Sequence, residues 1–143
     1  MRVVTGVAYH TEMSIDKNNL LETFAVIRPD LSVRKMKVTP TLYQELDTEF
    51  DGFGGHILVS AHEFTADWPS WERHPAGNEI VLLLSGSATF LIQTESGEVS
   101  LDLCAAGSYL VIPRGAWHTA KISGNARMLF ITPGEGTENR ATL

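Results

Sequence analysis

Residues 107–118, GSYLVIPRGAWH, are the stretch that decides the fold. An apolar run from Tyr109 to Ile112 ends in the turn Pro113-Arg-Gly115, and His118 follows shortly after that turn. Apolar runs of this length, bounded by glycine and proline, are typical of short β-strands. The stretch therefore predicts a strand and a tight turn that leave a histidine at the start of the next segment.

A second stretch, WERHPAGNE at 71–79, gathers more side chains that can bind a metal or move a proton. Glu72 and His74 are two positions apart, so in an extended strand both project from one face. A turn containing proline and glycine then brings Glu79 back beside them. This pattern predicts that two carboxylates and an imidazole converge.

The remainder of the second half of the chain is a series of short apolar runs separated by turn residues such as Ser85-Gly86-Ser87 and Glu95-Ser96-Gly97. The predicted strands are His56–Phe64, Glu79–Leu84, Ala88–Gln93, Val99–Leu103, Tyr109–Ile112 and Ala126–Ile131. No helical pattern lies between them, so the spacing favours an all-β protein with a closed or nearly closed antiparallel sheet. The strand Ile80–Leu84 is apolar on both faces, which predicts a second layer or a second subunit outside it.

Residues 1–51 differ from the body and are interpreted as a lead-in that packs on a barrel formed by residues 52–143, within one domain. Val33–Val38 alternates and predicts an edge strand whose lysines discourage further pairing. Thr39-Pro40 predicts a helix start. Leu42, Leu46 and Phe50 then recur at the spacing of a short amphipathic helix.

Composition excludes several classes of protein. The chain has 143 residues and a net charge of −6, whereas a nucleic-acid binder is usually basic. Its longest apolar run is far shorter than the ~20 residues of a membrane-spanning helix. The single cysteine, Cys104, fits a reducing compartment, so we expect a cytoplasmic protein with neither nucleic acid nor membrane as a partner.

The two stretches resemble the two motifs of the cupin superfamily, small β-barrels with a metal site inside. The first family motif is Gly, five residues, His-x-His, three or four residues, Glu, six residues, Gly; the second is Gly, five residues, Pro-x-Gly, two residues, His, three residues, Asn. The matching positions here are His74, Glu79, Gly86, Gly107, Pro113, Gly115 and His118. The resemblance implies a cupin jelly-roll barrel (double-stranded β-helix), extended by N-terminal strands and a short helix, in a homodimer.

The departures from the family pattern define the expected site. Glu72 replaces the first ligand histidine, Ala66 the opening glycine and Ile122 the final asparagine. The remaining ligands, His74, Glu79 and His118, suit one divalent ion of iron, manganese, nickel or zinc. Glu72 is then a fourth ligand, a general base beside the metal, or a side chain turned outward to pair with an arginine, Arg73 or Arg114.

Other candidates receive smaller roles. His56 and His62 are interpreted as bystanders and His10 is given no role, while Arg114 is a candidate for binding a substrate carboxylate. The aromatic residues are expected to pack the barrel mouth or to form one wall against an organic ligand; they are Trp68, Trp71, Trp117, Tyr109 and Phe90. The polar tail, residues 132–140, is expected to wrap the barrel or a partner and is assigned no chemistry.

Two functions remain open at this point. In the first, the protein is a metal-dependent enzyme, an oxidoreductase such as a dioxygenase or an isomerase, acting on a small organic molecule. In the second, it is a non-catalytic module that binds or senses a small ligand or a metal. Fold alone does not decide between them, because one barrel hosts unrelated functions.

Overall fold

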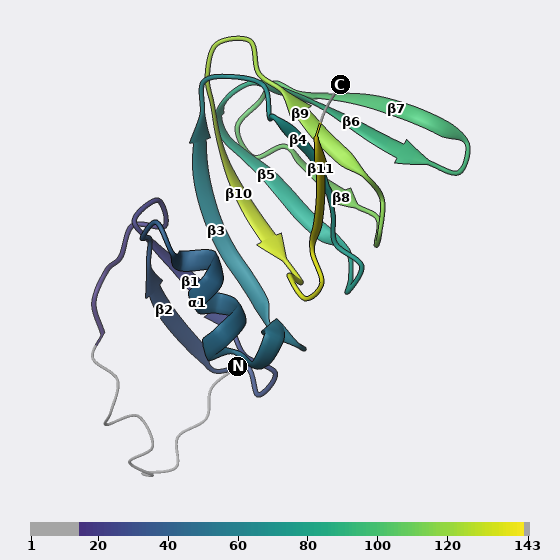
Figure 1. The fold of residues 1–143 in the computed structure, drawn as a ribbon. Coiled ribbons are helices and arrows are strands. Elements are labelled where there is room, and N and C mark those ends of the chain that lie inside the picture. Colours follow the sequence, from purple (N-terminus) through teal and green to yellow (C-terminus); the bar gives the residue numbers. More distant parts are fainter. Residues whose placement is uncertain (1–14, 142–143) are drawn as a thin grey trace, which may run out of the picture.

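The computed structural model describes residues 15–141, which form two antiparallel sheets that face each other (Figure 1). The six-stranded sheet has the order β2-β1-β3-β10-β5-β8, and the five-stranded sheet has the order β11-β4-β9-β6-β7. The strands are β1 (Thr23–Ile27), β2 (Val33–Lys37), β3 (Ile57–Phe64), β4 (Ser70–Arg73), β5 (Glu79–Gly86), β6 (Ala88–Thr94), β7 (Gly97–Leu103), β8 (Tyr109–Ile112), β9 (His118–Lys121), β10 (Ala126–Thr132) and β11 (Glu138–Ala141). Two helical segments, α1 (Leu42–Glu49) and the 3₁₀ turn η1 (Asp51–Phe53), complete the fold.

The core between the sheets follows from the alternation of side chains along each strand. On β5, Val81 and Leu83 are fully buried, and on β6 Phe90 is fully buried as well. Complete burial of such side chains stabilises the fold by about 1.5–3 kcal/mol each. The predicted all-β jelly-roll architecture is confirmed, because these inward positions of two opposed sheets make one continuous apolar cluster.

The turn after β5 requires glycine at position 86. Gly86 has a φ of +79°, and a Cβ atom there would overlap the carbonyl oxygen of Asn125. Residues with side chains rarely adopt this backbone region, and here the space for a side chain is also missing. This glycine closes the first motif because it lets β5 and β10 approach each other.

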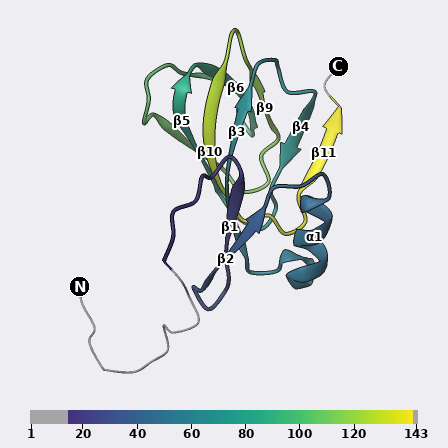
Figure 2. The same cartoon turned by 90° about the vertical axis from the view of Figure 1, so that its left-hand side faces the viewer.

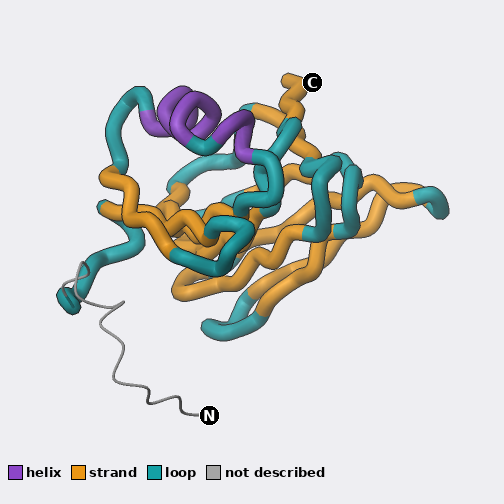
Figure 3. The backbone as a smooth tube through the Cα atoms, turned by 90° about the horizontal axis from the view of Figure 1, so that it is seen from below, coloured by secondary structure: helices purple, strands orange, loops and turns teal. Residues whose placement is uncertain are grey.

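The lead-in extends the six-stranded sheet by two strands, with β2 at the edge as predicted. Figure 2 shows this sheet continuing from β10 and β3 into β1, and Figure 3 shows α1 lying over the lead-in strands. Leu42, Leu46 and Phe50 are all buried in a second apolar cluster with β1 and β2. The predicted helix start was two residues too early: α1 begins at Leu42, and Thr41 is its N-cap. The hydroxyls of Thr39 and Thr41 both donate to the Glu45 carboxylate, which holds the segment before Leu42 as a turn.

The outer face of the six-stranded sheet is apolar, and α1 does not cover it, because this helix packs against the inner side. Ile80 and Leu82 are half-buried on this outer face, next to Val111 and Tyr109 on β8, which are 52% and 60% exposed. The described part of the lead-in, residues 15–51, therefore does not supply the cover that was expected outside Ile80–Leu84. Within residues 15–141, no helix has the length and apolar character needed to span a membrane.

Candidate metal centre

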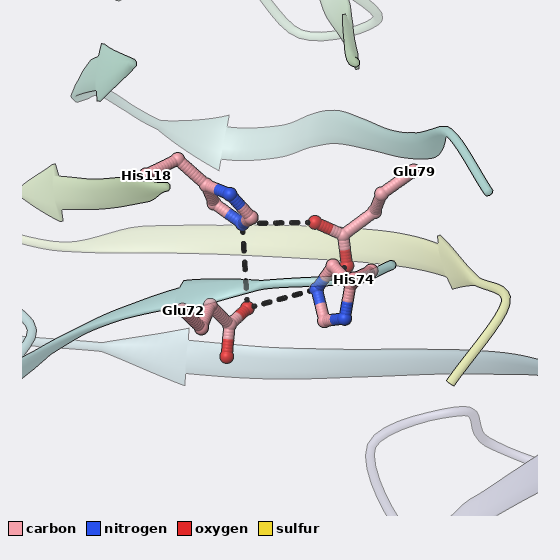
Figure 4. Close-up of side chains that lie close together, drawn as sticks. All are labelled: Glu72, His74, Glu79 and His118. Carbon is pink, nitrogen blue, oxygen red and sulfur yellow. Dashed lines mark ion pairs between the residues drawn. The ribbon is translucent and has the colours of Figure 1, made fainter. Parts of the chain in front are cut away.

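Four side chains converge inside the barrel, and the strand pairing explains why (Figure 4). Glu72 on β4 lies opposite His118 on β9 in the ladder between these strands. His74 follows the end of β4, and Glu79 is the first residue of β5. One ligand atom from each residue lies within 4.8 Å of all the others. The structure thus brings together all four residues that the sequence nominated.

The spacing of these atoms fits ligands arranged around one metal ion. The Nε2 atom of His74 is 3.2 Å from Glu79 Oε2 and 3.4 Å from Glu72 Oε1. The Nε2 atom of His118 is 3.2 Å from Glu79 Oε1 and 3.5 Å from Glu72 Oε1. Ligand atoms ~2.1 Å from one ion, at angles of ~90–110°, lie ~3.0–3.4 Å apart. Both Nε2 atoms and Glu79 Oε1 are buried without a hydrogen-bond partner, as ligand atoms of a metal are.

The two imidazoles are oriented by hydrogen bonds at their other nitrogen. The carbonyl oxygen of Ala116 accepts from His118 Nδ1 at 3.0 Å. The hydroxyl of Thr137 donates to the Gly134 carbonyl oxygen, so its oxygen accepts from His74 Nδ1 at 2.8 Å. With the proton assigned to Nδ1, each neutral imidazole presents its Nε2 lone pair to the centre, the arrangement typical of metal-binding histidines.

The carboxylates are held in two different ways. Glu79 is 2% exposed, and its Oε2 atom accepts a hydrogen bond from the Thr132 hydroxyl at 2.6 Å. The Glu72 side chain is 26% exposed and its carboxylate points toward the two imidazoles (Figure 4). Of the three alternatives for Glu72, the outward pairing with an arginine is not the one seen, because its Oε1 atom faces both Nε2 atoms and Arg73 forms its ion pair with Glu138 on the neighbouring strand β11.

The electrostatics of the four groups are mutually stabilising. Burial alone lowers the pKa of His74 and of His118, but the carboxylates of Glu72 and Glu79 outweigh burial and raise each pKa to about 9. Burial raises the pKa of Glu72, and the two imidazoles overcome it and lower this pKa to about 2. The pKa of Glu79 is likewise lowered, against its burial, by the same two imidazoles. Without a metal, the centre is therefore two imidazolium–carboxylate pairs with no net charge.

A cavity of about 700 Å³ opens beside the centre. Glu72, His74 and Glu79 form part of its wall, so a small molecule inside it reaches the candidate metal position. Its volume lies within the range of pockets that bind small organic ligands. His62 on β3 and Tyr43 on α1 also line this cavity.

Several residues differ from their sequence-based interpretation. His62 lines the cavity, whereas His56 lies outside it, with its Nδ1 atom 2.8 Å from the Gly54 carbonyl oxygen. The tail carries a role that was not predicted, because Thr137 orients His74. Arg114 is exposed and does not line the cavity; its backbone N–H donates to Asn78 Oδ1. His10 lies outside the described residues.

The aromatic residues divide between the cavity, the core and the surface. Trp68 lines the cavity together with three phenylalanines, while Phe90 belongs to the core. Trp117 stacks with the guanidinium of Arg140 at 4.5 Å from its ring centre, on the side of β4 and β11. Of the five aromatic residues selected from the sequence, Trp68 alone lines this cavity.

Comparison with known proteins supports the fold. No family model matches the sequence, and no curated protein matches it either. Oxalate oxidase in complex with the substrate analogue glycolate is 22% identical over 57% of this chain, with a TM-score of 0.50. Peruvianin-I, a cysteine peptidase from Thevetia peruviana latex, is 15% identical over 61% of this chain and 57% of its own, with a TM-score of 0.52.

These likenesses, together with the two-sheet architecture, define the class: the chain has the cupin fold, as the two sequence motifs predicted. At these identities they concern the fold alone. The aligned part covers 45% of the oxalate oxidase chain, so this chain spans less than half of that protein. Within the fold, the buried cluster of two histidines and two glutamates is typical of a cupin metal site.

Proposed function

We propose that this protein is a cupin that binds one divalent metal ion through His74, Glu79, His118 and Glu72. The observation that carries the proposal is the pair of buried Nε2 atoms without hydrogen-bond partners, each on an imidazole whose Nδ1 proton is already donated elsewhere. A buried nitrogen atom of this kind is stabilised either by a proton or by a metal ion. Imidazole and carboxylate ligands together suit iron, manganese, nickel or zinc.

We further propose that the centre acts on a small organic molecule held in the cavity, as an oxidoreductase or an isomerase. A bound divalent metal supplies Lewis-acid chemistry and orients substrate oxygen atoms. The protein contributes the rest: Thr137 and Thr132 fix the ligand side chains, and aromatic side chains such as Trp68 line the cavity beside them. Glu72 is the most exposed of the four ligands and also lines the cavity, so its carboxylate is accessible to a bound molecule.

We also propose a homodimer formed through the outer face of the six-stranded sheet. The supporting observation is that Ile80, Leu82, Tyr109 and Val111 share this face, where a free antiparallel sheet normally carries polar residues. A cytoplasmic location stays a prediction from the sequence, as does the division into residues 1–51 and 52–143.

Elemental analysis of protein purified without a metal-affinity tag tests the metal site. The expected result is about one equivalent of a divalent transition metal per chain, lost in His74→Ala and in His118→Ala. The matched control is His56→Asn, which removes an imidazole outside the cluster and should keep the metal. An unchanged metal content in both alanine variants would overturn the proposal, and so would a parent protein that takes up no metal.

The catalytic part has a separate test. Protein reconstituted with iron, manganese, nickel or zinc is incubated with a panel of small organic compounds, and oxygen uptake and product formation are followed. Turnover by one of these forms, reduced in Glu72→Gln, supports the proposal. Tight binding of a compound without turnover by any reconstituted form would contradict it and assign the protein to the binding or sensing class.

A further inference from the structure

The charges around the cavity disfavour an anionic ligand. Among the described residues, no lysine or arginine lines it, whereas four carboxylates do: Glu72, Glu79, Asp47 and Asp67. One divalent metal ion in the centre would balance the charges of its two glutamates and leave Asp47 and Asp67 as further carboxylates on the wall. Lys121 lies 3.6 Å from Asp67 but is not part of the wall. An entering carboxylate would therefore lose its hydration and meet further carboxylates, with no lysine or arginine on the wall to pair with.

The wall next to the centre is aromatic. Trp68 packs against Phe64 and Phe130, with ring centres 5.5 and 6.0 Å away, and all three residues line the cavity. Leu58 and Phe53 extend this apolar surface toward the lead-in. A wall of this composition favours a ligand with a flat apolar body, since stacking and burial both contribute there.

A second group of polar side chains, Tyr43 and His62, lines the same cavity outside the four-residue centre. The hydroxyl of Tyr43, from α1, lies 3.4 Å from Nε2 of His62, from β3. The His62 imidazole is wedged among three aromatic rings, those of Phe24, Phe64 and Phe130. Tyr43 is 60% exposed, which places it at the cavity mouth. Burial lowers the pKa of His62, while burial, Glu72 and Glu79 raise the pKa of Tyr43 to about 12, so both groups are neutral at pH 7.

We propose that the cavity binds an uncharged molecule with an aromatic body and an oxygen atom at each end, and that it discriminates against carboxylate anions. One oxygen meets the four-residue centre, and the other is bound by the hydroxyl of Tyr43 and the imidazole of His62. The inference rests on the proposed function for the first end of the molecule only. Under this inference, Tyr43 on α1 and His62 on β3 determine which molecules the cavity binds.

Two compounds of matched shape test this inference by calorimetry. The probes are 1,4-benzenedimethanol, which is neutral, and terephthalate, which has the same ring and a charged carboxylate at each end. Each is titrated into zinc-loaded protein and into chelator-treated protein, and oxalate is included as a small dianion. The expected result is that the diol binds at least ten times more tightly than terephthalate in both forms. Equal or tighter binding of terephthalate, or no binding of the diol, would overturn the inference.

Two tyrosine variants provide a matched comparison. Tyr43→Phe removes the cavity hydroxyl and should weaken binding of the diol roughly three- to tenfold, the usual effect of one lost hydrogen bond. Tyr109→Phe removes a hydroxyl from a tyrosine that is equally exposed but lies outside the cavity, and should have no effect. His62→Phe should weaken binding of the diol to a similar extent as Tyr43→Phe. Equal affinities in all three variants and the parent would contradict the assignment.

The same samples separate this inference from the proposed function. Zinc content is measured on each by elemental analysis. A protein that binds zinc yet prefers terephthalate refutes the ligand class and leaves the metal site standing. A protein that binds no zinc yet prefers the diol refutes the metal site and leaves the cavity assignment standing.

Discussion

Binding of a divalent metal at pH 7 is expected to release about two protons from the protein. The pKa values of His74 and His118 are about 9 without a metal, so each imidazole is ~99% protonated at pH 7. A metal binds only the neutral imidazole, and each histidine must therefore lose its proton. Glu72, with a pKa of about 2, and Glu79, whose pKa is also lowered, are already ionised and contribute none.

The pH dependence of this release has a definite sign. At pH 9 each imidazole is about half protonated, so about one proton in total is released, and at pH 10 the number approaches zero. Below pH 9 the apparent affinity for the metal consequently rises with pH, by up to ~100-fold for each unit. Above pH 9 the affinity no longer depends on these two groups.

Isothermal titration calorimetry measures the number of released protons. Zinc is titrated into chelator-treated protein at pH 7 in buffers with different ionisation enthalpies, and the slope of the observed enthalpy against that enthalpy gives the proton number. His56→Asn, changed outside the cluster, should release the same number as the parent. A release near zero at pH 7, or the same release at pH 7 and pH 9, would refute the reasoning.

Four further predictions follow from the structure. Thr137→Val should weaken metal binding roughly tenfold, because His74 loses the acceptor that orients it, and a metal titration measures this. Gly86→Ala should cost more than about 2 kcal/mol in chemical denaturation, and clearly more than Gly97→Ala, whose site is open. In chelator-treated protein, the ion pairs of the centre should stabilise the fold most between pH 4.5 and 6.5. The contribution of the histidines is lost as pH rises through about 9, and that of Glu72 as pH falls through about 2, so the melting temperature should decline in both directions. Leu82→Lys should convert the proposed dimer to a monomer in analytical ultracentrifugation; an unchanged sedimentation coefficient, or a monomeric parent, would contradict that interface.

The strands that the sequence predicted are those with a strong local signal. Tyr109–Ile112 and Ala126–Ile131 combine apolar residues with turns at both ends, and the structure confirms them within one residue. The strands β4, β9 and β11 were not among the predicted strands, because each has four residues of mostly polar character and is defined by its neighbours. The apolar strand β1 was not predicted either, although its sequence TFAVI carries a strand signal. β11 is exposed throughout, and its pairing with β4 depends on a contact between distant parts of the chain.

The candidate site shows the same division between local and distant information. Glu72, His74, Glu79 and His118 were found because motif spacing places ligand atoms in register within each stretch. Thr137, Tyr43 and His62 were missed because each is an ordinary residue whose role depends on what the fold packs beside it. The tail carries a local turn signal, because Pro133-Gly134 favours a turn, and the N–H of Thr137 donates to the Gly134 carbonyl oxygen. This signal could have pointed to an ordered loop around Thr137.

The most direct test of the central claim is an anomalous difference map from a crystal grown with manganese and recorded where that metal scatters anomalously. The predicted result is a single strong peak about 2.1–2.3 Å from both Nε2 atoms of His74 and His118, with carboxylate oxygens of Glu79 and Glu72 completing the ligands. The peak should be absent in His118→Ala. A map without a peak at this position, or with the metal bound elsewhere on the chain, would contradict the account.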